Sequence, residues 1–194
     1  ALDSFAADAE RQAMDEQLKL AAIVFSQSAE AIMVTDAEHR ILMVNRAYSE
    51  ITGYSADEVV GRNPSLMASG CHDESYYRSM WEALHSSGHW QGEMWNRRKN
   101  GEIYPEMVSI SRVIDAEGKI SHYVGIFTDI SEHHANEAHI HRLAYYDSLT
   151  GLPNRALLAE RAGQELSRVE RSGETLAMVF LDLDRFKNVN DSLG

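Results

Sequence analysis

The chain has 194 residues, of which 44% are hydrophobic, a proportion that is normal for folded globular domains. Thirty acidic residues outnumber 18 basic ones, so the formal net charge is -12. Because such a chain repels polyphosphate backbones, and no basic stripe with interleaved aromatic residues occurs, we expect no nucleic-acid partner.

The single cysteine, Cys71, cannot form an intrachain disulfide, which fits a reducing compartment. No apolar run reaches the ~18 residues that a membrane helix needs, and the first residues do not resemble a signal peptide. We therefore expect a cytoplasmic chain with no membrane-spanning segment. Since it does not begin with Met, we expect an excerpt of a longer parent protein. Whether that parent has a membrane anchor upstream is an open question.

The first segment, residues 1–24, is predicted to be a linker helix. Phe5, Ala9, Ala13, Leu18 and Ile23 alternate with polar residues, and the segment contains neither Gly nor Pro. Two roles are open for this helix. It either pairs with its copy in a dimer or packs as a solvated arm on its own domain.

From residue 31 onwards the pattern changes to two short strands, AIMVTD and RILMVN, joined by a turn at 37–39. Asn45 can cap a following helix that Gly53 ends. Ser55 and Glu58 form an S-x-x-E capping box for a second short helix, which Gly61 closes. These features predict small helices next to a sheet.

A longer helix is predicted to begin after Asp73 and to end at Gly88. Three strands follow: HWQGEMWNRRK, EIYPEMVSISRV and KISHYVGIFTDI. Asn100-Gly101 is a strong hairpin signal between the first two, and Pro105 is expected at a sheet edge or a bulge. The element order predicts an α+β domain in which a five-stranded antiparallel sheet carries helices on one face and encloses a cavity.

The stretches VTDAEHRILMVNRAYSEITGYSADEVVGRNP and GIFTDISE resemble a PAS sensor domain with its PAC end, over residues 25–131. The resemblance implies the PAS fold, flanked by signalling helices that support a homodimer. It also implies that Asp129 couples the sensor to the output helix that follows. A simple helix-capping role for Asp129 is compatible with this coupling.

Residues 132–146 contain neither Gly nor Pro and are predicted to form a connecting signalling helix. Five side chains in this segment are typical metal ligands: His133, His134, Glu137, His139 and His141. A solvated linker helix explains the same polar residues, and we favour that interpretation.

Two motifs after the linker resemble a GGDEF, or diguanylate cyclase, domain, of which residues 147–194 would be the truncated start. DSLTGLPNR, residues 147–155, resembles the opening of such domains, and LDLDRFKNVNDSLG, residues 181–194, resembles their first nucleotide-binding segment. Between the motifs, Asn154 can cap a helix that Gly173 ends, and LAMVFLDL is typical of a buried strand. We therefore expect an incomplete α/β domain here.

The GGDEF resemblance implies residue roles. Asp182 would bind Mg²⁺ together with the carbonyl group of Leu183. Mg²⁺ prefers oxygen ligands, and the bound ion would connect the protein to the substrate phosphates. The backbone at Arg185 and Phe186 would face the phosphates of GTP, and Asn190 would recognise guanine. Without the resemblance, the acids would be solvated loop residues and Asn190 a helix cap.

In the GGDEF family, two facing subunits join two GTP molecules into cyclic di-GMP (c-di-GMP). The 194 residues contain no GGDEF or GGEEF signature, so we expect the chain itself to be catalytically inactive. The parent is expected to be a diguanylate cyclase that the PAS domain regulates. The alternative is a cofactor-free PAS dimerisation module in a GGDEF-EAL phosphodiesterase.

A cofactor in the PAS domain is a separate question. The stretch MWEALHSSGHWQGEMWNRRKNGEIY is similar to the FAD-binding PAS domain of nitrogen-fixation regulator flavoproteins. This similarity implies an FAD pocket with Asn63, Trp81, Trp90 and Asn96, in which an aromatic ring packs on the flavin and an amide hydrogen-bonds its edge. The alternative is that the tryptophans belong to the core and side chains fill the cavity.

Two other cofactor chemistries are disfavoured. Light-sensing flavin relatives need a reactive cysteine shortly after a GRN-like turn, whereas here the turn at 61–63 is followed by Pro64, and Cys71 lies elsewhere. Haem would need an axial histidine such as His72 or His85. We instead expect His72 to cap the start of the helix and His85 to face solvent.

Overall fold

The computed structural model describes residues 2–179, 181, 182, 184, 185 and 191, and the side chains from residue 11 onwards. The chain forms two compact units, residues 1–135 and residues 136–194. The first unit contains a sheet and the helices that pack on it. The second contains most of a connecting helix and one further helix.

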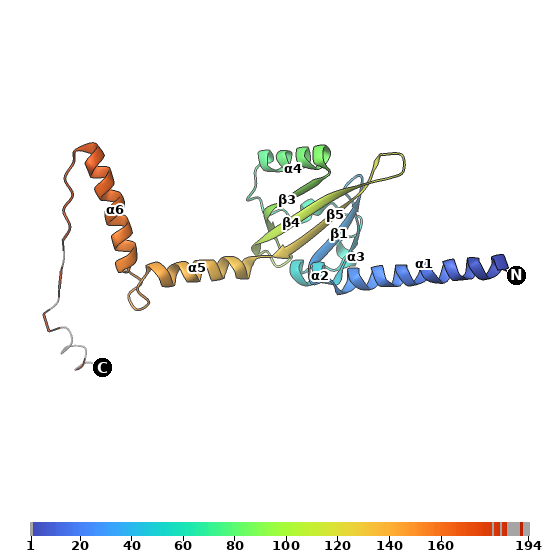
Figure 1. Ribbon diagram of the computed structural model, residues 1–194, viewed down its shortest axis with the longest axis horizontal. Coiled ribbons are helices and arrows are strands. Elements are labelled where there is room, and N and C mark those ends of the chain that lie inside the picture. The colour runs from blue at the N-terminus through green and yellow to red at the C-terminus, as the bar shows by residue number, and fades with distance from the viewer. Residues whose placement is uncertain (1, 180, 183, 186–190, 192–194) are drawn as a thin grey trace. The chain divides into compact units, whose positions relative to one another are not determined.

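The first unit is built on one five-stranded antiparallel sheet (Figure 1). Its spatial order is β2-β1-β5-β4-β3, so the first two strands and the last three strands of the chain meet where β1 pairs with β5. This confirms the predicted five-stranded sheet. The strands are β1 (Ala31–Asp36), β2 (Ile41–Val44), β3 (His89–Arg97), β4 (Ile103–Ile114) and β5 (Ile120–Asp129).

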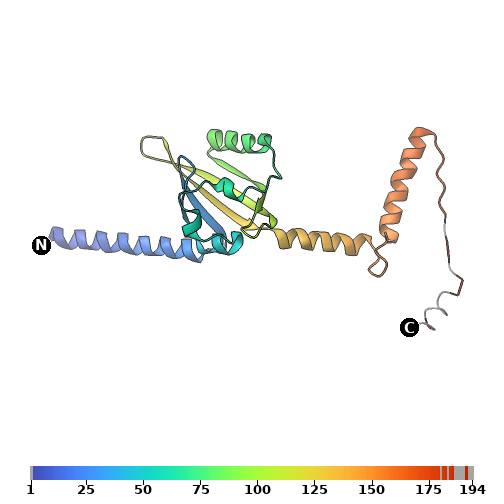
Figure 2. The same cartoon turned by 180° about the vertical axis from the view of Figure 1, so that it is seen from behind.

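Short helices cover one face of the sheet, as the two opposite views show (Figures 1 and 2). Helix α2 packs on β1, α3 packs on β2, and α4 packs on β3 and β4. The fold is therefore the α+β layer arrangement that the element order predicts. The bounds are α2 (Arg46–Thr52), α3 (Ala56–Val59), the 3₁₀ helix η1 (Pro64–Met67) and α4 (Glu74–Ser87).

Asn45 fixes the junction between β2 and α2. Its Oδ1 accepts hydrogen bonds from the backbone N–H groups of Ile32, at 2.9 Å, and Tyr48, at 3.0 Å. Its Nδ2 donates to the carbonyl oxygens of Phe25 and Glu30. The predicted cap is confirmed, and the same buried side chain also connects the end of the first helix to β1.

Most of the other predicted helix ends are confirmed, but Gly61 does not close α3: the helix ends at Val59, Val60 is its C-cap, and the Gly61 N–H donates to the Ile41 carbonyl of β2. Gly53 and Gly88 adopt left-handed backbone angles after α2 and α4, where a residue with a Cβ atom would be strained. The Asp73 carboxylate accepts a hydrogen bond from the N–H of Tyr76 at the start of α4. The Ser55 N–H donates to the Glu58 carboxylate, as a capping box requires.

The hairpin between β3 and β4 closes around residues 99–101, where the Arg98 N–H donates to the Glu102 carbonyl. Pro105 does not lie on an edge strand, because β4 pairs with both β3 and β5. The pairing with β5 ends at Glu106 and Asp129, however, so Pro105 lies at a local edge of an internal strand. The Pro105 carbonyl accepts a hydrogen bond from the Ile130 N–H, so the backbone of Pro105 faces the β5 side of β4. Strand β5 has already ended there, at Asp129. The missing N–H of Pro105 therefore costs no hydrogen bond of the strand ladder.

The hydrophobic core lies between the helices and the inner face of the sheet. Tyr48, Val59 and Leu84 enter it from α2, α3 and α4, and Ile41 and Phe127 enter it from β2 and β5. Tyr48 and Phe127 meet edge to face with ring centroids 5.7 Å apart. This packing leaves one part of the layer open, and the candidate site lies there.

The first helix, α1 (Leu2–Gln27), is confirmed, but its described side chains do not form a packed arm. Apolar residues along it are exposed, from 55% for Ile23 to 69% for Val24. The interpretation of α1 as an arm packed on its own domain is therefore wrong for residues 11–24, whereas the last turn of the helix contacts α2 and is bound by Asn45. An apolar stripe in this position is available for pairing with a second helix.

Helix α5 (Ser131–Tyr145) confirms the connecting helix, and α6 (Arg155–Ser172) confirms the helix that Asn154 caps and Gly173 ends. The loop between them spans residues 146–154 and contains all of the DSLTGLPNR motif except Arg155, which begins α6. Within it, Asp147 Oδ1 accepts hydrogen bonds from the Thr150 N–H and hydroxyl groups, and this carboxylate organises the turn.

The strand expected at LAMVFLDL, residues 176–183, is wrong for the residues that the structure describes. Residues 176–179, 181 and 182 form no strand, and Val179 and Leu181 are largely exposed. None of the described residues of α5 and α6 is buried either. An apolar segment becomes a buried strand through its neighbours in a sheet, and the described part of this unit supplies none.

No helix among the described residues is both long enough and apolar enough to cross a membrane.

Candidate functional site

A cavity of about 330 Å³ lies between the inner face of the sheet and the helices. This volume is within the range of about 300–1,000 Å³ that small-molecule sites occupy. Its walls are mainly apolar, and flexible methionine side chains form much of them, which suits a pocket that adapts to its contents. The methionines are Met33, Met67, Met80 and Met94.

Three of the four residues suggested for a flavin pocket line this cavity: Asn63, Trp81 and Asn96. Trp81 forms a cluster with two other rings of the wall, His39 at 4.5 Å and Tyr123 at 5.7 Å between centroids, and these two rings are 5.1 Å apart. Neither His39 nor Tyr123 was expected in the cavity wall from the sequence.

Asn96 is 6% exposed and contributes a polar edge to the cavity. Its Nδ2 donates to Glu106 Oε1 at 2.8 Å and lies 3.7 Å from Met94 Sδ. Asn96 Oδ1 takes no hydrogen bond from any described residue, so it can accept one from a bound molecule. Asn63 has a local role as well, because its Oδ1 caps η1 through the Ser65 N–H.

Trp90 does not line the cavity. It packs edge to face against Tyr76 with centroids 6.0 Å apart, and its ring lies over Gly92 in the same strand, where a Cβ atom would come within 2.6 Å of the indole. For Trp90, the core alternative is therefore correct.

His72 and His85 also lie outside the cavity lining. His72 does not cap α4, because Asp73 does; instead, His72 Nε2 accepts a hydrogen bond of 2.8 Å from the Trp95 N–H, and its ring stacks on Tyr76. His85 is exposed, as expected, with Nδ1 at 2.6 Å from the Trp81 carbonyl oxygen. Cys71 is exposed and is likewise absent from the lining.

Glu106 is the charged group of the cavity wall, and the sequence analysis missed it. The side chain is 2% exposed, and both carboxylate oxygens have partners: Oε1 accepts from Asn96, and Oε2 accepts from the Tyr104 hydroxyl at 2.6 Å. Burial raises the pKa of Glu106 to about 7, although the two hydrogen bonds favour the ionised form. Glu106 can therefore exchange a proton near neutral pH.

The alternation of β4 contained the signal for Glu106. In a strand, every second side chain faces the same side, and Tyr104, Glu106, Val108 and Ile110 share the register of the apolar inner face. A glutamate in that register must be buried, and it needs hydrogen-bond partners.

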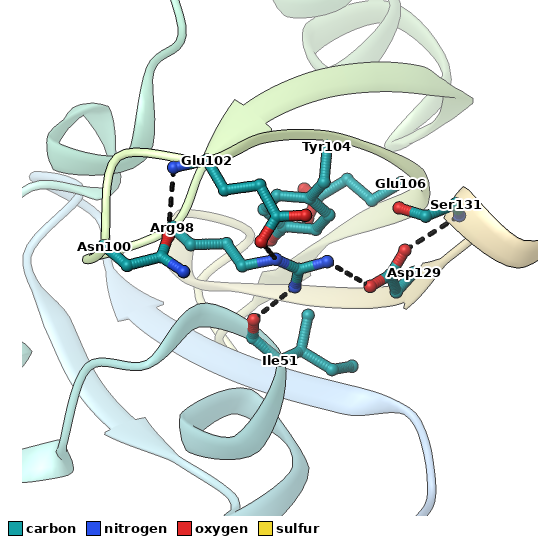
Figure 3. A network of polar contacts seen from close by, with 8 residues as sticks. All are labelled: Ile51, Arg98, Asn100, Glu102, Tyr104, Glu106, Asp129 and Ser131. Atoms are coloured by element: carbon teal, nitrogen blue, oxygen red, sulfur yellow. Dashed lines mark hydrogen bonds and ion pairs between the residues drawn. The ribbon is translucent and has the colours of Figure 1, made fainter.

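A chain of contacts runs from Glu106 to the beginning of α5 (Figure 3). Tyr104 hydrogen-bonds Glu106, and the guanidinium carbon of Arg98 lies 3.8 Å from the centroid of the Tyr104 ring. Arg98 forms an ion pair with Asp129 Oδ2, and Asp129 Oδ1 accepts a 2.8 Å hydrogen bond from the N–H of Ser131, the first residue of α5. Asp129 thus both caps the helix and joins it to the sheet.

The Arg98–Asp129 pair is well shielded from solvent, with side-chain exposures of 15% and 27%. Burial acts to raise the pKa of Asp129, but the hydrogen bonds from Ser131 and Arg98 outweigh it and hold the pKa below its usual value. Arg98 also donates to the Ile51 carbonyl at the end of α2 and pairs with Glu102 at 3.2 Å. One guanidinium group therefore connects α2, the β3–β4 turn and the entry to α5.

Among the described residues, no group of three or more His, Cys, Asp or Glu side chains is arranged to hold a metal ion. Of the linker histidines, His134 has a defined partner on the sheet: its Nε2 lies 3.1 Å from Glu93 Oε1, and its ring lies 6.0 Å from that of Trp95. His134 thus contacts β3 from the first turn of α5.

The residues suggested for Mg²⁺ and GTP are not assembled into a site in the described part of the chain. Asp182 and Arg185 are exposed, and Arg185 has a left-handed backbone with φ 59°. Leu183, Phe186 and Asn190 lie outside the described residues.

Comparisons with known proteins agree with this geometry. A family model described as "PAS domain" matches residues 29–132, which is more than half of the chain. A second model, described as "Diguanylate cyclase, GGDEF domain", matches residues 144–194.

Three relatives represent both parts of the chain. A nitrogen fixation regulatory protein of Klebsiella oxytoca is 34% identical over 105 residues, which are 54% of this chain and 21% of that protein. The diguanylate cyclase DgcP of Pseudomonas aeruginosa is 53% identical over 51 residues, 26% of this chain and 8% of the relative. The cyclic di-GMP phosphodiesterase PdeR of Escherichia coli is 27% identical over 179 residues, 91% of this chain and 27% of the relative. The chain thus spans no more than about a quarter of the length of these relatives.

Solved structures share the fold of the first unit. The PAS domain of a protein from Colwellia psychrerythraea has a TM-score of 0.56 and 24% identity, covering 59% of this chain and 98% of that one. A light-oxygen-voltage domain studied with a flavin analogue has a TM-score of 0.53 and 24% identity, covering 64% and 93%. Together with the family match, these similarities show that the chain belongs to the PAS domain family, with a partial GGDEF domain after the PAS domain.

Proposed function

We propose that this chain is the sensory part of a protein that controls c-di-GMP turnover, and that the protein is a diguanylate cyclase that converts two GTP molecules into c-di-GMP. The observation that carries the proposal is the connection itself. A PAS domain with an internal cavity leads through α5 directly into the GGDEF match at 144–194. The 53% identity over 51 residues to a diguanylate cyclase supports the enzymatic class.

In this proposal Asp129 is the coupling residue, since it bonds both to Arg98 in the PAS domain and to the first N–H of α5. The exposed apolar side chains of α1 support a homodimer in which the PAS domain and its flanking helices pair, as two facing cyclase subunits require. Asp182 and the Leu183 carbonyl would bind Mg²⁺. The segment containing Arg185, Phe186 and Asn190 would bind GTP.

The test uses the complete gene expressed in bacteria, with c-di-GMP measured in cell extracts. A cyclase raises c-di-GMP, Asp182→Ala abolishes the rise, and Asp129→Asn changes its size while the protein level stays constant. A protein that leaves c-di-GMP unchanged, or an Asp182→Ala variant that is as active as the parent, would contradict the proposal.

The cyclic di-GMP phosphodiesterase PdeR supplies a second candidate function, because its similarity extends over 91% of this chain and includes both parts. In that alternative, the PAS domain is a dimerisation module without a cofactor in a GGDEF-EAL phosphodiesterase. The same experiment separates the two functions. A phosphodiesterase lowers c-di-GMP, and its activity survives Asp182→Ala.

For the cavity, we propose FAD as the cofactor, and the residues present fit a flavin. Trp81 and the methionines offer apolar walls for a flat ring, and Asn96 Oδ1 is available to accept a hydrogen bond from the ring edge. A bound flavin would supply redox sensing. The protein's own residues would orient the ring and exclude water from it.

The absorption spectrum of the purified chain tests this assignment. Flavin bands are expected, with FAD released on denaturation, and Asn96→Ala should weaken FAD retention at least tenfold. Trp90→Phe is the matched control, since Trp90 packs outside the cavity, and it should retain FAD. A colourless protein that does not take up added FAD would refute the cofactor.

A further inference from the structure

Glu106 is a buried acid in contact with both the cavity and the output helix. It lines the cavity, and its carboxylate accepts hydrogen bonds from Asn96 and Tyr104. A proton or a ligand hydrogen bond that reaches Oε2 draws on the same negative charge and weakens the hydrogen bond that Tyr104 donates. We propose that Glu106 is the residue that senses the contents of the cavity, and that Tyr104 is a positioning residue that passes its charge state to Arg98, Asp129 and the start of α5. The inference rests on the proposed sensory role of the PAS domain.

Tyr104 is the first link between Glu106 and Arg98. When Glu106 is ionised, the Tyr104 hydroxyl donates to it at 2.6 Å, and a donated hydrogen bond to an anion increases the electron density of the phenol ring. The Arg98 guanidinium group lies 3.8 Å from the centre of the same ring. A more electron-rich ring attracts the cation more strongly, so ionised Glu106 favours the position of Arg98 over Tyr104.

The charges around Glu106 form the second link. Arg98 and Asp129 both act on its carboxylate, the first by attraction and the second by repulsion. The charge of Glu106 in turn helps to raise the pKa of Tyr48 in α2. Glu106 and Asp129 are thus two carboxylates that act on the same guanidinium group, Asp129 through an ion pair and Glu106 only through its electrostatic field. When Glu106 loses its charge, this attraction on Arg98 disappears, while the ion pairs of Arg98 with Asp129 and Glu102 remain.

The third link leads to the output helix. Arg98 is tied to α2 through the Ile51 carbonyl, and Asp129 is tied to α5 through the Ser131 N–H (Figure 3). A tighter Arg98–Asp129 pair therefore holds the first turn of α5 more firmly on the PAS domain, and a looser pair releases it. A ligand that donates an N–H or O–H group to Glu106 leaves the negative charge in place, so it acts on this path by weakening the hydrogen bond from Tyr104.

Protonation is a probe for this coupling that needs no identified ligand. The experiment follows three nitrogen-bound proton signals of the ¹⁵N-labelled 194-residue chain by NMR from pH 5 to pH 8: the Asn96 side-chain amide, the Arg98 Nε–H and the Ser131 backbone amide. All three are expected to shift with one common midpoint near the pKa of about 7 of Glu106. In Glu106→Gln, none of the three signals should shift with that midpoint.

Tyr104→Phe removes the hydroxyl group that links the two halves of the path. The Asn96 amide signal should still shift with pH in this variant, because Asn96 bonds Glu106 directly. The pH-dependent shift of the Ser131 amide signal should fall at least threefold. His134→Gln is the control for the histidine in the first turn of α5, and it should leave the midpoint of Ser131 unchanged. Dispersed amide spectra establish that each variant is folded. If Tyr104→Phe does not fold, Glu106→Gln decides alone.

Two results would overturn the inference: a Ser131 amide that does not move while Asn96 titrates in the unmodified chain, or one that still titrates in Glu106→Gln. Neither depends on flavin or on c-di-GMP. A failure of FAD binding or of cyclase activity is therefore distinguishable from a failure of this coupling.

Discussion

The pKa of Glu106 makes a quantitative prediction about stability. Burial raises this pKa from the ordinary value of 4.5 to about 7, so the folded protein binds the proton more tightly than the unfolded chain does. The contribution of Glu106 to the free energy of unfolding is therefore fully present below pH 4.5 and is lost as the pH rises through 7. At about 1.4 kcal/mol per pH unit, the complete loss is about 3 kcal/mol.

Glu106→Gln tests this reasoning, because an amide of the same shape keeps a partner for Asn96 and Tyr104 and cannot ionise. Between pH 5 and pH 8, the free energy of unfolding of the variant should rise by about 2–3 kcal/mol relative to that of the parent chain. Glu117→Gln, an identical chemical change in the exposed β4–β5 turn, is the matched control and should stay within about 0.5 kcal/mol.

Urea unfolding followed by tryptophan fluorescence is the assay, since all three tryptophans lie in α4 and β3 of the PAS domain. The signal thus reports the PAS domain alone, even though the chain has a second unit. A stability difference between Glu106→Gln and the parent chain that is constant from pH 5 to pH 8 would refute the assignment of a buried, titrating carboxyl group.

Three further substitutions test the packing, each measured by the same urea assay. Asn45→Ala should lower the free energy of unfolding by about 2–4 kcal/mol, because four buried hydrogen bonds are lost, and a loss below 1 kcal/mol would contradict its role. Leu84→Ala should cost about 2–5 kcal/mol through the cavity it creates, whereas a neutral effect would show that the core can collapse around it. Gly92→Ala should displace the Trp90 ring and cost about 1–3 kcal/mol, with a red shift of the fluorescence; an unchanged spectrum would speak against the close contact.

The network around Arg98 also gives a physical reason for the proposed signalling role of this PAS domain. A cavity can regulate a helix outside it only if some element has different energies in the two states of the cavity. Here that element is the Arg98 guanidinium group, which pairs with Asp129, lies over the Tyr104 ring and is attracted by the charge of Glu106. Small changes at the wall can therefore alter how firmly α5 begins.

Much of the fold could be predicted from local sequence, because the relevant signals act over a few residues. Asn45 and Asp73 begin helices, Gly53 and Gly88 end them, and Asn100-Gly101 marks a hairpin. Such caps and turns depend on the conformational preferences of single residues and on bonds to near neighbours. They determined the order of the elements, and the order determined the layered fold.

The candidate site was predictable only in part. Trp81 and Asn96 could be suggested through a family resemblance. The same resemblance wrongly assigned Trp90 to the cavity wall, whereas Trp90 packs against Tyr76. The position of Pro105 depended on where β5 ends. Residues 176–179 remained without a strand, because a buried strand needs partners that local sequence does not provide.

The sequence by itself determined the helices and the five strands of the PAS domain, and it carried the resemblance to the two families. Only the tertiary structure decided that Glu106 faces the cavity beside Asn96, and that Arg98 reaches Asp129, which is 31 positions away in the chain. The reason is physical: these contacts join β3, β4 and β5, so their geometry follows from the pairing of strands that are distant in sequence.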